Sequence, residues 1–471
     1  MESWSWPPRF DDDYLPDASQ PYWFRVRETM DPGERERAIL ERIRQVMAYA
    51  WEQAPFYRRK WSEAGISPSS IRTLEDFERV PVVTKAELRI AQAEHEPFGD
   101  YLCIREEEVF HIHGTSGTTG RPTAFGIGRD DWRAIGNATA RVMWGMGIRP
   151  SDTVFVGAFF SLYMGSWAVL AGAERIGCRV FPFGAGAAGQ TARAVQWLEQ
   201  MRPTAFYGTP SYALHIAETA RGQGVDPHAF GLRRLFFSGE PGASVPGIRA
   251  KLEAEFGARV FDCGSMAEMS PWMNLAESEG QPGMLAWQDI VYTEVVDPVG
   301  HARVPYGREG SPVYTHLERT SQPMIRLFSG DLTRWEAGPG DCGRTYPLLP
   351  RGIYGRIDDQ FTVRGENIYP SAIDDVVMAL AGYGGEHRII VSRDQAMDEL
   401  MVEVEYSTEV RQEGEAAIHA LGRRASERLR TVLGVGAKVV TVPPGTFERT
   451  DLKARRVVDH REFIESRQPV P

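Results

Sequence analysis

The chain has 471 residues, of which 42% are hydrophobic and 25% are charged, a mixture typical of a folded globular protein. Its 53 Lys and Arg residues against 64 Asp and Glu residues give a formal net charge of −11. Because an acidic chain is a poor electrostatic partner for nucleic acid or an anionic membrane, we expect it to bind neither. The length predicts roughly three domains or subdomains.

The cysteines and the N-terminus predict a cytoplasmic protein. Cys103, Cys178, Cys263 and Cys342 are too scattered for a local zinc ribbon or a CxxC pair, and they fit a reducing compartment. The first residues, MESWSWPPRFDDDYLPD, lack the basic segment and the apolar run of a secretory signal. The uncharged segment Thr153–Ala173 contains glycines and hydroxyls, and it predicts a buried strand, a loop and a helix rather than a membrane span.

The first part of the chain predicts an α/β fold. A helix is expected to begin at Asp31-Pro32, since Asp is a favoured N-cap and Pro a favoured first helical residue. Between residues 100 and 265, short apolar runs alternate with helical patterns, which is typical of a parallel sheet with crossover helices. The expected strands are Thr153–Phe160, Arg179–Phe183, Ala205–Tyr207 and Arg234–Phe237, and the expected helices are Thr191–Met201 and Gly247–Phe256.

The later part predicts two more units. Ile290–Val296 and Gly310–Tyr314 read as antiparallel strands of a small β-rich subdomain. A Pro- and Gly-rich stretch, GPGDCGRTYPLLPRG, then precedes a new alternation of strands and helices. We therefore expect a large N-terminal domain, 1–357, of parallel α/β subdomains plus the β-rich subdomain, followed by a small mobile α+β domain, 358–471. In this domain Leu400, Val402, Val404 and Tyr406 alternate with Met401, Glu403 and Glu405, as in a half-buried strand. One face of an expected helix is lined by Ile418, Leu421, Ala425, Leu429 and Val432.

The strongest local signal is a loop of glycines and hydroxyl residues that follows the predicted strand Glu108–Ile112. Small residues let backbone N–H groups approach a phosphate chain closely, although such a loop can also occur without a ligand. The loop consists of Thr115, Ser116, Gly117, Thr118, Thr119 and Gly120, followed by the cation Arg121. Its spacing is not GxxxxGK[ST], so the fold that accompanies that motif is not implied. For the neighbouring His111 and His113, we favour a structural or pocket-lining role over a metal site.

A series of short motifs runs through nearly the whole chain. They are Ala54–Lys60, Pro81–Arg89, the glycine-rich loop, Tyr207–Tyr212, Ser238–Gly242, Gly330–Leu332, Gly355–Asp359, Arg364–Pro370 and Thr450–Arg456. Together and in this order they resemble the adenylate-forming superfamily of acyl- and aryl-CoA synthetases, most closely its phenylacetate–CoA ligase branch. Each motif alone is weak, but the ordered set is specific.

The resemblance implies a reaction in two steps. A carboxylic acid, expected to be aromatic, attacks the α-phosphate of Mg-ATP and gives an acyl-adenylate and pyrophosphate. A thiol, expected to be that of coenzyme A, then displaces AMP and gives a thioester. The implied cofactors are therefore ATP, Mg²⁺ and coenzyme A, and relatives of this kind often form homodimers.

The resemblance also assigns roles to residues. Lys453, Glu268 and Arg121 would be catalytic, with Lys453 neutralising charge that grows on the α-phosphate and Glu268 binding Mg²⁺. Asp358 would be a hinge between the domains. The nucleotide would contact Thr115–Gly120 together with Ser238, Gly239, Glu240, Pro241, Asp262, Asp331 and Arg356. The thiol side would contain Arg364 and Gly365. The acyl pocket would contain Phe160, Tyr163, Phe183, Tyr207, Gly208 and Met266, although each aromatic residue could instead belong to the core.

The chain departs from the family pattern at three places. Ala267 replaces a threonine whose hydroxyl helps to hold phosphate or carboxylate, and Arg121 stands where Lys is common. Many relatives in the branch also carry a zinc cluster. Here Ser278, Leu285 and Gly340 stand at ligand positions and only Cys342 is left, so we expect no zinc.

Three alternatives to the acyl-CoA ligase stay open. The acceptor could be a carrier-protein thiol or an amine instead of coenzyme A. The chain also resembles deazaflavin-adenylylating synthetases, which stop at nucleotide transfer. Finally, the Ala267 substitution and the lost zinc ligands would suit a non-catalytic nucleotide-binding relative, whereas the retained Glu268, Asp331 and Lys453 argue for an enzyme.

Overall fold

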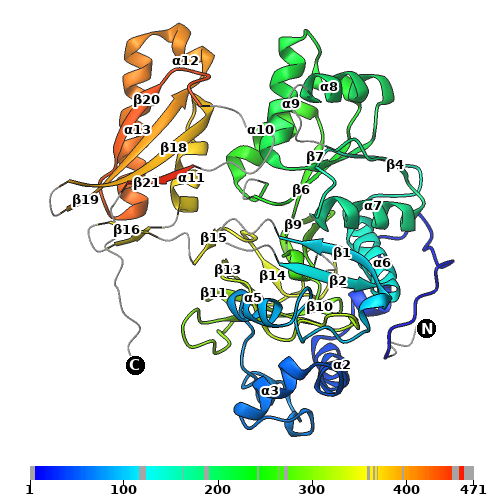
Figure 1. Cartoon of the computed structure of the whole chain (residues 1–471). Helices are drawn as coiled ribbons and strands as arrows, with labels where there is room; N and C mark the ends of the chain where they lie inside the picture. Colours follow the sequence, from blue (N-terminus) through cyan, green and yellow to red (C-terminus); the bar gives the residue numbers. More distant parts are fainter. Residues whose placement is uncertain are drawn as a thin grey trace. The chain divides into compact units, whose positions relative to one another are not determined.

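The structure is a computed structural model of the chain (Figure 1). It describes residues 6–115, 123–162, 164–184, 190–240, 243–264, 266–269, 274–357, 361–363, 366–368, 370–394, 397–447 and 456–460. The chain divides into two compact units, Met1–Ser244 with Leu252–Tyr354, and Val245–Lys251 with Gly355–Pro471. The expected domain boundary between residues 357 and 358 stays a prediction. No helix among the described residues is both long enough and apolar enough to cross a membrane.

The N-terminal segment of the first unit is helical. Asp31 caps α2 as expected, since its Oδ1 accepts hydrogen bonds from the N–H groups of Gly33 (2.9 Å) and Glu34 (3.1 Å). A capping box of Thr84 and Glu87 begins α5. The elements are α1 (Arg25–Glu28), α2 (Pro32–Gln53), α3 (Pro55–Glu63), η1 (Pro68–Ser70), α4 (Leu74–Phe77), α5 (Lys85–Glu94) and η2 (Glu106–Glu108).

An eight-stranded sheet forms the centre of the first unit, in the order β14-β9-β8-β7-β6-β5-β3-β4. The five strands from β7 to β4 in this order are parallel, as the alternation predicted, and β8, β9 and β14 add to them antiparallel. Their bounds are β3 (Thr153–Val156), β4 (Arg179–Phe181), β5 (Ala205–Gly208), β6 (Arg234–Phe237), β7 (Arg259–Gly264), β8 (Leu275–Ser278), β9 (Gln281–Ala286) and β14 (Leu348–Leu349).

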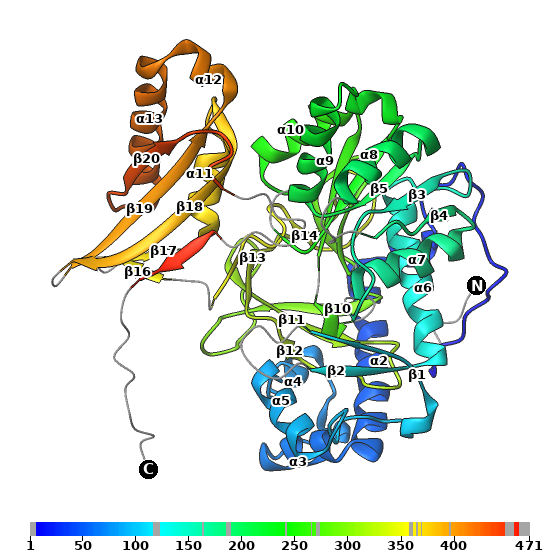
Figure 2. The ribbon, with the colours of Figure 1, turned by 45° about the horizontal axis from the view of Figure 1, so that its top comes forward.

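Helices cover both faces of this sheet. Val156 and Tyr207 share one apolar core with Ala168 of α7. Because side chains alternate along a strand, the stacked pair Phe155 and Phe206 points to the other face. Figure 2 shows α8, α9 and α10 beside the strands, apart from the neighbouring pair α6 and α7. The bounds are α6 (Arg129–Gly145), α7 (Met164–Ile176), α8 (Gln190–Met201), α9 (Pro210–Gly222), η3 (Pro227–Phe230), α10 (Pro246–Phe256) and η4 (Ala267–Met269).

Two predicted strands end earlier than expected. The strand expected over Thr153–Phe160 ends at Val156, and the next, expected to reach Phe183, ends at Phe181. After Val156 the chain turns into α7, and the helix holds this turn. The Ser166 hydroxyl donates to the Phe159 carbonyl (2.8 Å) and the Trp167 indole donates to the Ser161 carbonyl (2.8 Å). The apolar run Thr153–Ala173 is therefore a strand, a turn and a helix, as the glycines and hydroxyls indicated.

Two smaller β structures complete the first unit. The hairpin β1 (Val109–Gly114) and β2 (Ala124–Gly128) is antiparallel. The β-rich subdomain is also antiparallel, and β10 pairs with β11 from Val291↔His316 to Val296↔Ser311, as expected. Its strands are β10 (Val291–Val296), β11 (Glu309–His316), β12 (Leu327–Phe328) and β13 (Asp331–Arg334).

The second unit contains a four-stranded sheet in the order β20-β19-β18-β21. Leu400, Val402, Val404 and Tyr406 of β19 are buried as predicted, and so are Leu421, Ala425 and Leu429 of α13. Val432, expected on the same helix face, is 58% exposed, because it lies in the last turn of α13, just before the left-handed Gly434 that ends the helix. The elements are β15 (Gly355–Arg356), β16 (Phe361–Val363), β17 (Glu366–Ile368), α11 (Pro370–Met378), β18 (Tyr383–Asp394), β19 (Met397–Tyr406), α12 (Thr408–Glu413), α13 (Glu415–Leu433), β20 (Lys438–Val442) and β21 (Val457–Asp459).

Candidate active site

Several predicted site residues follow the carboxyl ends of the parallel strands. Tyr207 and Gly208 end β5, and Ser238 follows β6 directly. The Ser238 N–H donates to the Gly208 carbonyl (3.2 Å), and the Tyr207 and Ser238 hydroxyls lie 2.8 Å apart, both buried. Because parallel strands end at one edge of a sheet, this is where such folds place their ligands.

The segment after β6 is fixed by a carboxylate. Glu240 is buried, and its Oε1 accepts a hydrogen bond from the backbone N–H of Ser211 (2.8 Å), in the first turn of α9. A carboxylate near a helix N-terminus is stabilised by the unpaired N–H groups there. Gly239 adopts a φ of +90°, a conformation that favours glycine, so the turn requires this residue.

Glu268 lies on η4, shortly after β7, and it is only 3% exposed. Its Oε1 is 3.5 Å from the Nζ of Lys85, and its Oε2 has no hydrogen-bond partner among the described residues. A buried carboxylate oxygen without a partner is costly unless a ligand or cation completes it. Glu268 is therefore placed as a cation ligand would be, with Lys85 already beside it.

Lys85 is a residue of the candidate site that the motifs did not single out. It begins α5, and its side chain is 33% exposed. Its position inside the Pro81–Arg89 motif could have drawn attention to it, but the resemblance assigned no role to that motif. Further along the same helix, Gln92 exchanges two hydrogen bonds with the backbone of Ala124, which starts β2. Helix α5 thus connects Glu268 with the hairpin that carries the glycine-rich loop.

The described residues close the base of the glycine-rich loop. The Thr115 N–H donates to the Thr123 carbonyl (3.1 Å), and the two threonine hydroxyls lie 2.7 Å apart. Strand β1 contacts η4, so the base of the loop lies next to the element that carries Glu268. A phosphate held by this loop would therefore be near the unsatisfied carboxylate. Ser116, Gly117, Thr118, Thr119, Gly120 and Arg121 lie outside the described residues.

The histidines before the loop are packed rather than arranged around a metal. The His113 ring is buried, and its Nδ1 lies 3.3 Å from the Leu162 carbonyl oxygen. Burial lowers the pKa of His113 to about 4, so the ring is neutral near pH 7. Its neighbour His111 stacks on Trp132 at 3.9 Å between ring centroids. The structural role expected for the pair agrees with this packing.

The other predicted nucleotide residues come from three different strands. Asp262 is buried in β7, where its N–H donates to Glu277 Oε2 (3.0 Å). Asp331 begins β13 and is half-buried. Arg356 belongs to the second unit. The remaining predicted residues outside the described ranges are Tyr163, Pro241, Asp358, Arg364, Gly365 and Lys453.

The predicted acyl residues do not all lie together. Phe160 packs edge-on against Trp167 at 5.2 Å, and Met266 is buried. Phe183 stacks on Phe155, which points to the sheet face opposite to that of Tyr207. Phe183 therefore packs in the layer on that opposite face, the alternative that was open for each aromatic residue. Its role in the acyl pocket stays a prediction, as do the roles of the other members.

The expected zinc positions contain no ligand set among the described residues. Leu285 is fully buried in the apolar core. A Cβ at Gly340 would meet the amide of Gln281, so a side chain there would require Gln281 to move. In the described part of the chain, no group of three or more His, Cys, Asp or Glu side chains could hold a metal ion.

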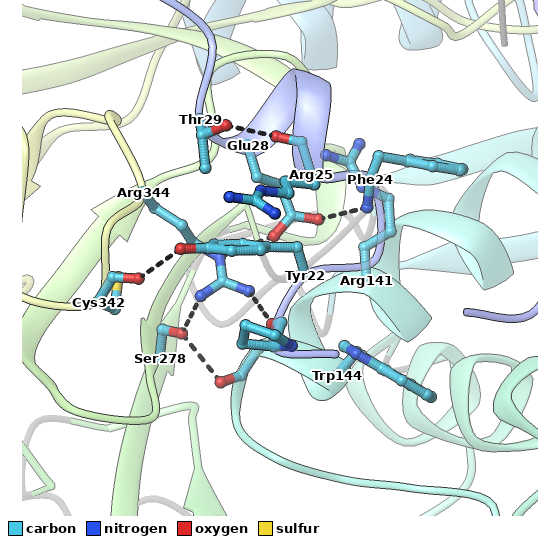
Figure 3. A network of polar contacts seen from close by, with 12 residues as sticks. Tyr22, Phe24, Arg25, Glu28, Thr29, Arg141, Trp144, Ser278, Cys342 and Arg344 are labelled. Carbon is cyan, nitrogen blue, oxygen red and sulfur yellow. Dashed lines mark hydrogen bonds and ion pairs between the residues drawn. The ribbon is translucent and has the colours of Figure 1, made fainter. Parts of the chain in front are cut away.

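An arginine network fills this region instead (Figure 3). The Arg344 guanidinium donates to Glu28 Oε2 (2.8 Å) and to the Ser278 hydroxyl (2.8 Å), and it lies over the Tyr22 ring. The Tyr22 hydroxyl in turn donates to the Cys342 carbonyl (3.2 Å). A buried cation with a matched carboxylate joins the same chain segments that a metal would join, and its charge disfavours a second cation.

We expect the purified protein to bind no structural zinc. Elemental analysis of protein from zinc-supplemented cultures should find far less than one equivalent, and EDTA should leave the thermal midpoint unchanged. A midpoint that falls on chelation, together with stoichiometric zinc, would contradict this prediction. The variant Arg344→Met provides the comparison, since it should lower the midpoint whether or not metal is present.

Comparisons with known proteins place the chain in a family. Residues 63–314 match the family described as AMP-binding enzyme, and residues 365–461 match the AMP-binding enzyme C-terminal domain. The chain is 33% identical to a phenylacetate-coenzyme A ligase of Thermus thermophilus, over 92% of this chain and 98% of that protein. The chain belongs to the AMP-binding enzyme family. The motifs had predicted this adenylate-forming superfamily, and the prediction is confirmed.

Further relatives agree with this assignment. A phenylacetate-coenzyme A ligase of Pseudomonas putida is 32% identical, over 92% of this chain and 96% of that protein. Among solved structures, 2-hydroxyisobutyryl-CoA ligase with its acyl-adenylate, in the postadenylation state, is 63% identical, with a TM-score of 0.94 over 98% of this chain and 97% of that one. The same ligase with the adenylate and coenzyme A, in the thioesterification state, is 64% identical over the same shares, with a TM-score of 0.76. The predicted fold class, a large α/β domain followed by a small α+β domain, is thereby confirmed.

Proposed function

We propose that this chain is an AMP-forming acid–CoA ligase, which converts a carboxylic acid and ATP into an acyl-adenylate and pyrophosphate and then forms the CoA thioester. The observation that carries the proposal is the buried Glu268 carboxylate. Its Oε2 has no hydrogen-bond partner among the described residues, and the carboxylate lies beside Lys85 and next to the base of the glycine-rich loop. Relatives that are named CoA ligases, one of them solved with adenylate and coenzyme A, support coenzyme A over a carrier protein or an amine.

The described residues fit Mg²⁺ as the cation of the first step. Mg²⁺ prefers oxygen ligands, and it usually binds to one or two carboxylates together with substrate phosphates. Glu268 supplies one such carboxylate, with its Oε2 still available. The bound ion would offset negative charge on the phosphates. Lys85 can donate hydrogen bonds to phosphate oxygens from the same place, so two cations would surround the reacting group.

The roles of the residues outside the described ranges rest on family membership. Lys453 would neutralise charge on the α-phosphate and on the attacking carboxylate, and Arg121 would assist from the glycine-rich loop. His113 is neutral near pH 7, so it adds no positive charge beside the loop. The cytoplasmic location and the homodimer also stay predictions.

For the acid, we favour a small branched 2-hydroxy acid over an aromatic one. The solved relatives with about 63% identity are named for 2-hydroxyisobutyrate, whereas the relatives named for phenylacetate are about a third identical. The paired hydroxyls of Tyr207 and Ser238 supply polar atoms at the strand ends, and these atoms suit a substrate hydroxyl. The aromatic acid expected from the sequence is the second candidate.

Acid-dependent exchange of pyrophosphate into ATP tests the proposal. The panel should contain 2-hydroxyisobutyrate, its analogue 2,2-dimethylpropanoate, phenylacetate, benzoates and short fatty acids, with thioester formation from coenzyme A as the second readout. We expect the highest exchange with 2-hydroxyisobutyrate and about tenfold less with the analogue that lacks the hydroxyl, since an unpaired polar group costs about 1–3 kcal/mol. Ser238→Ala should reduce this preference, and Lys453→Ala controls for contaminating enzymes.

The exchange and thioester assays could also give three other results, each of which supports a different function. A preference for phenylacetate would support the aromatic acid. Exchange without thioester formation would point to another acceptor or to nucleotide transfer alone. ATP-dependent thermal stabilisation without exchange for any acid would contradict the ligase and favour a non-catalytic nucleotide-binding protein.

A further inference from the structure

Glu386 and Arg456 form a buried ion pair in the second unit, and neither residue is assigned a catalytic or binding role above. The Arg456 guanidinium donates from Nε to Glu386 Oε1 (2.6 Å) and from its terminal nitrogen to Glu386 Oε2 (3.4 Å). The two side chains are only 14% and 11% exposed. Such a two-contact pair fixes the orientation of the guanidinium as well as its position.

A hydrogen-bonded group of three side chains, Tyr383, His387 and Asp374, lies next to this ion pair. The His387 ring is fully buried, with Nδ1 2.9 Å from the Tyr383 hydroxyl and Nε2 2.7 Å from Asp374 Oδ1. The backbone N–H of His387 also donates to Glu386 Oε1 (3.0 Å). This oxygen therefore accepts hydrogen bonds from both Arg456 and His387. Helix α11 is thereby joined to β18, and β18 to Arg456.

The charges show that Arg456 is held strongly. Burial lowers the pKa of Arg456, but the carboxylates of Glu386 and Asp374 outweigh that effect and raise it above its ordinary value. Buried ion pairs of this kind add little net stability compared with apolar residues of the same size. What such a pair provides is a defined position, because the guanidinium has few other places where its charge is compensated.

The backbone at Arg456 is held at the same point. Its carbonyl accepts a hydrogen bond from the Ile389 N–H (2.7 Å), and the parallel pairing of β21 with β18 begins at Ile389↔Val457. Strand β21 covers only Val457–Asp459, so its ladder is short. The side-chain pair therefore adds to a weak ladder at the residue where the strand starts.

We propose that Glu386 and Arg456 are positioning residues for Lys453 in the adenylation step. Lys453 stands three positions before Arg456, and three residues of chain span at most about 11 Å. A fixed Arg456 thus limits where the lysine can go, and a displacement of about 1 Å at a reacting group can cost about 100-fold in rate. This inference rests on the proposed function, in which Lys453 acts in adenylation.

The test separates the two half-reactions in the full-length enzyme. Glu386→Gln keeps the side-chain size and removes the charge. We expect it to lower acid-dependent pyrophosphate exchange about 10- to 100-fold, whereas CoA thioester formation from pre-made acyl-adenylate stays within about twofold of the wild type. Arg456→Lys, which retains the charge but not the two-contact geometry, should give a smaller loss.

Matched controls show whether the effect is specific. Arg388 and Glu403 form a partly exposed ion pair on the same sheet, 3.8 Å apart, so Arg388→Gln should leave both half-reactions unchanged. The double variant Glu386→Arg with Arg456→Glu should recover part of the exchange activity. A parallel loss of both half-reactions in Glu386→Gln, or no loss in either, would overturn the proposal.

Limited proteolysis tests the positioning of Lys453 without measuring catalysis, so its result does not depend on the proposed function. Trypsin cleavage after Lys453 should be faster in Glu386→Gln than in the wild type, because the chain after the lysine is held less firmly. Equal cleavage rates would count against the anchor even if the wild-type protein proved inactive. Absence of exchange in the wild type, together with faster cleavage in the variant, would instead reject the proposed function alone.

Discussion

Replacing Glu268 with Gln is expected to slow adenylation about 100- to 1,000-fold, the range for loss of one preorganised electrostatic contact in an active site. Glutamine has almost the same shape, so packing around η4 should survive. An amide, however, is a much poorer Mg²⁺ ligand than a carboxylate. The substitution therefore removes a charge from the site while leaving its walls in place.

The measurement should include binding as well as rate. We expect the Mg²⁺ concentration for half-maximal exchange to rise in Glu268→Gln, and the thermal stabilisation by Mg-ATP to shrink. Glu279→Gln is the control, because Glu279 lies on the turn after β8, is 41% exposed, and pairs with Arg234 and Arg259 rather than with Lys85. Unchanged Mg²⁺ dependence in Glu268→Gln would show that another residue binds the cation.

Lys85 is the described side chain that lies beside the Glu268 carboxylate. Its ammonium is 3.5 Å from Glu268, so before substrate arrives it partly compensates the buried carboxylate. No local pattern reveals this contact, since the residues are far apart in sequence and the pairing depends on how α5 packs. The motif around Lys85 marked the segment as belonging to the family but did not show which side chain faces the site.

The same contrast between local and long-range signals holds across the fold. Asp31-Pro32 predicted the start of α2 because capping is a local matter, and the alternation of apolar runs predicted the parallel strands. The pairing of Arg344 with Glu28 could not be predicted, since it joins positions 316 residues apart. Phe183 shows a related limit, because hydrophobicity marks a residue as buried without showing which face of the sheet it joins.

The family resemblance proposed the site residues through the order and spacing of motifs, and it gave no geometry for them. Ser238 and Glu240 follow β6, and Glu268 lies on η4 shortly after β7, but the roles that the motifs assigned to them stay predictions. The substitutions at Ser278, Leu285 and Gly340 could be identified in the sequence. The contacts of Arg344 could not, because a single arginine forms no sequence pattern from which they could be predicted. The absence of zinc stays a prediction.

The largest expected stability effect is for Arg326→Met. The Arg326 guanidinium is 2% exposed, and it donates to Glu294 Oε2 (3.1 Å) and to the carbonyls of Glu78 and Val80. Removing one partner of a buried ion pair costs about 3–5 kcal/mol, because the other charge is left without compensation. We expect a loss of that size in urea unfolding at pH 7.5. Arg334→Met, which breaks an exposed pair with Glu336 in the same subdomain, should cost at most about 1 kcal/mol.

The loss in Arg326→Met should also depend on pH. Burial raises the pKa of Glu294 to about 6, while Arg326 opposes that shift. A raised carboxyl pKa means that the folded state binds the proton more tightly, so this contribution to stability is full below the unfolded value of 4.5 and is lost as pH rises through 6. Without Arg326 the pKa rises further, so the difference from the wild type should be smaller at pH 5 than at pH 7.5 by about 1–2 kcal/mol. A difference that stayed constant between the two pH values would mean that the lost carbonyl contacts, rather than the uncompensated Glu294 charge, cause the instability.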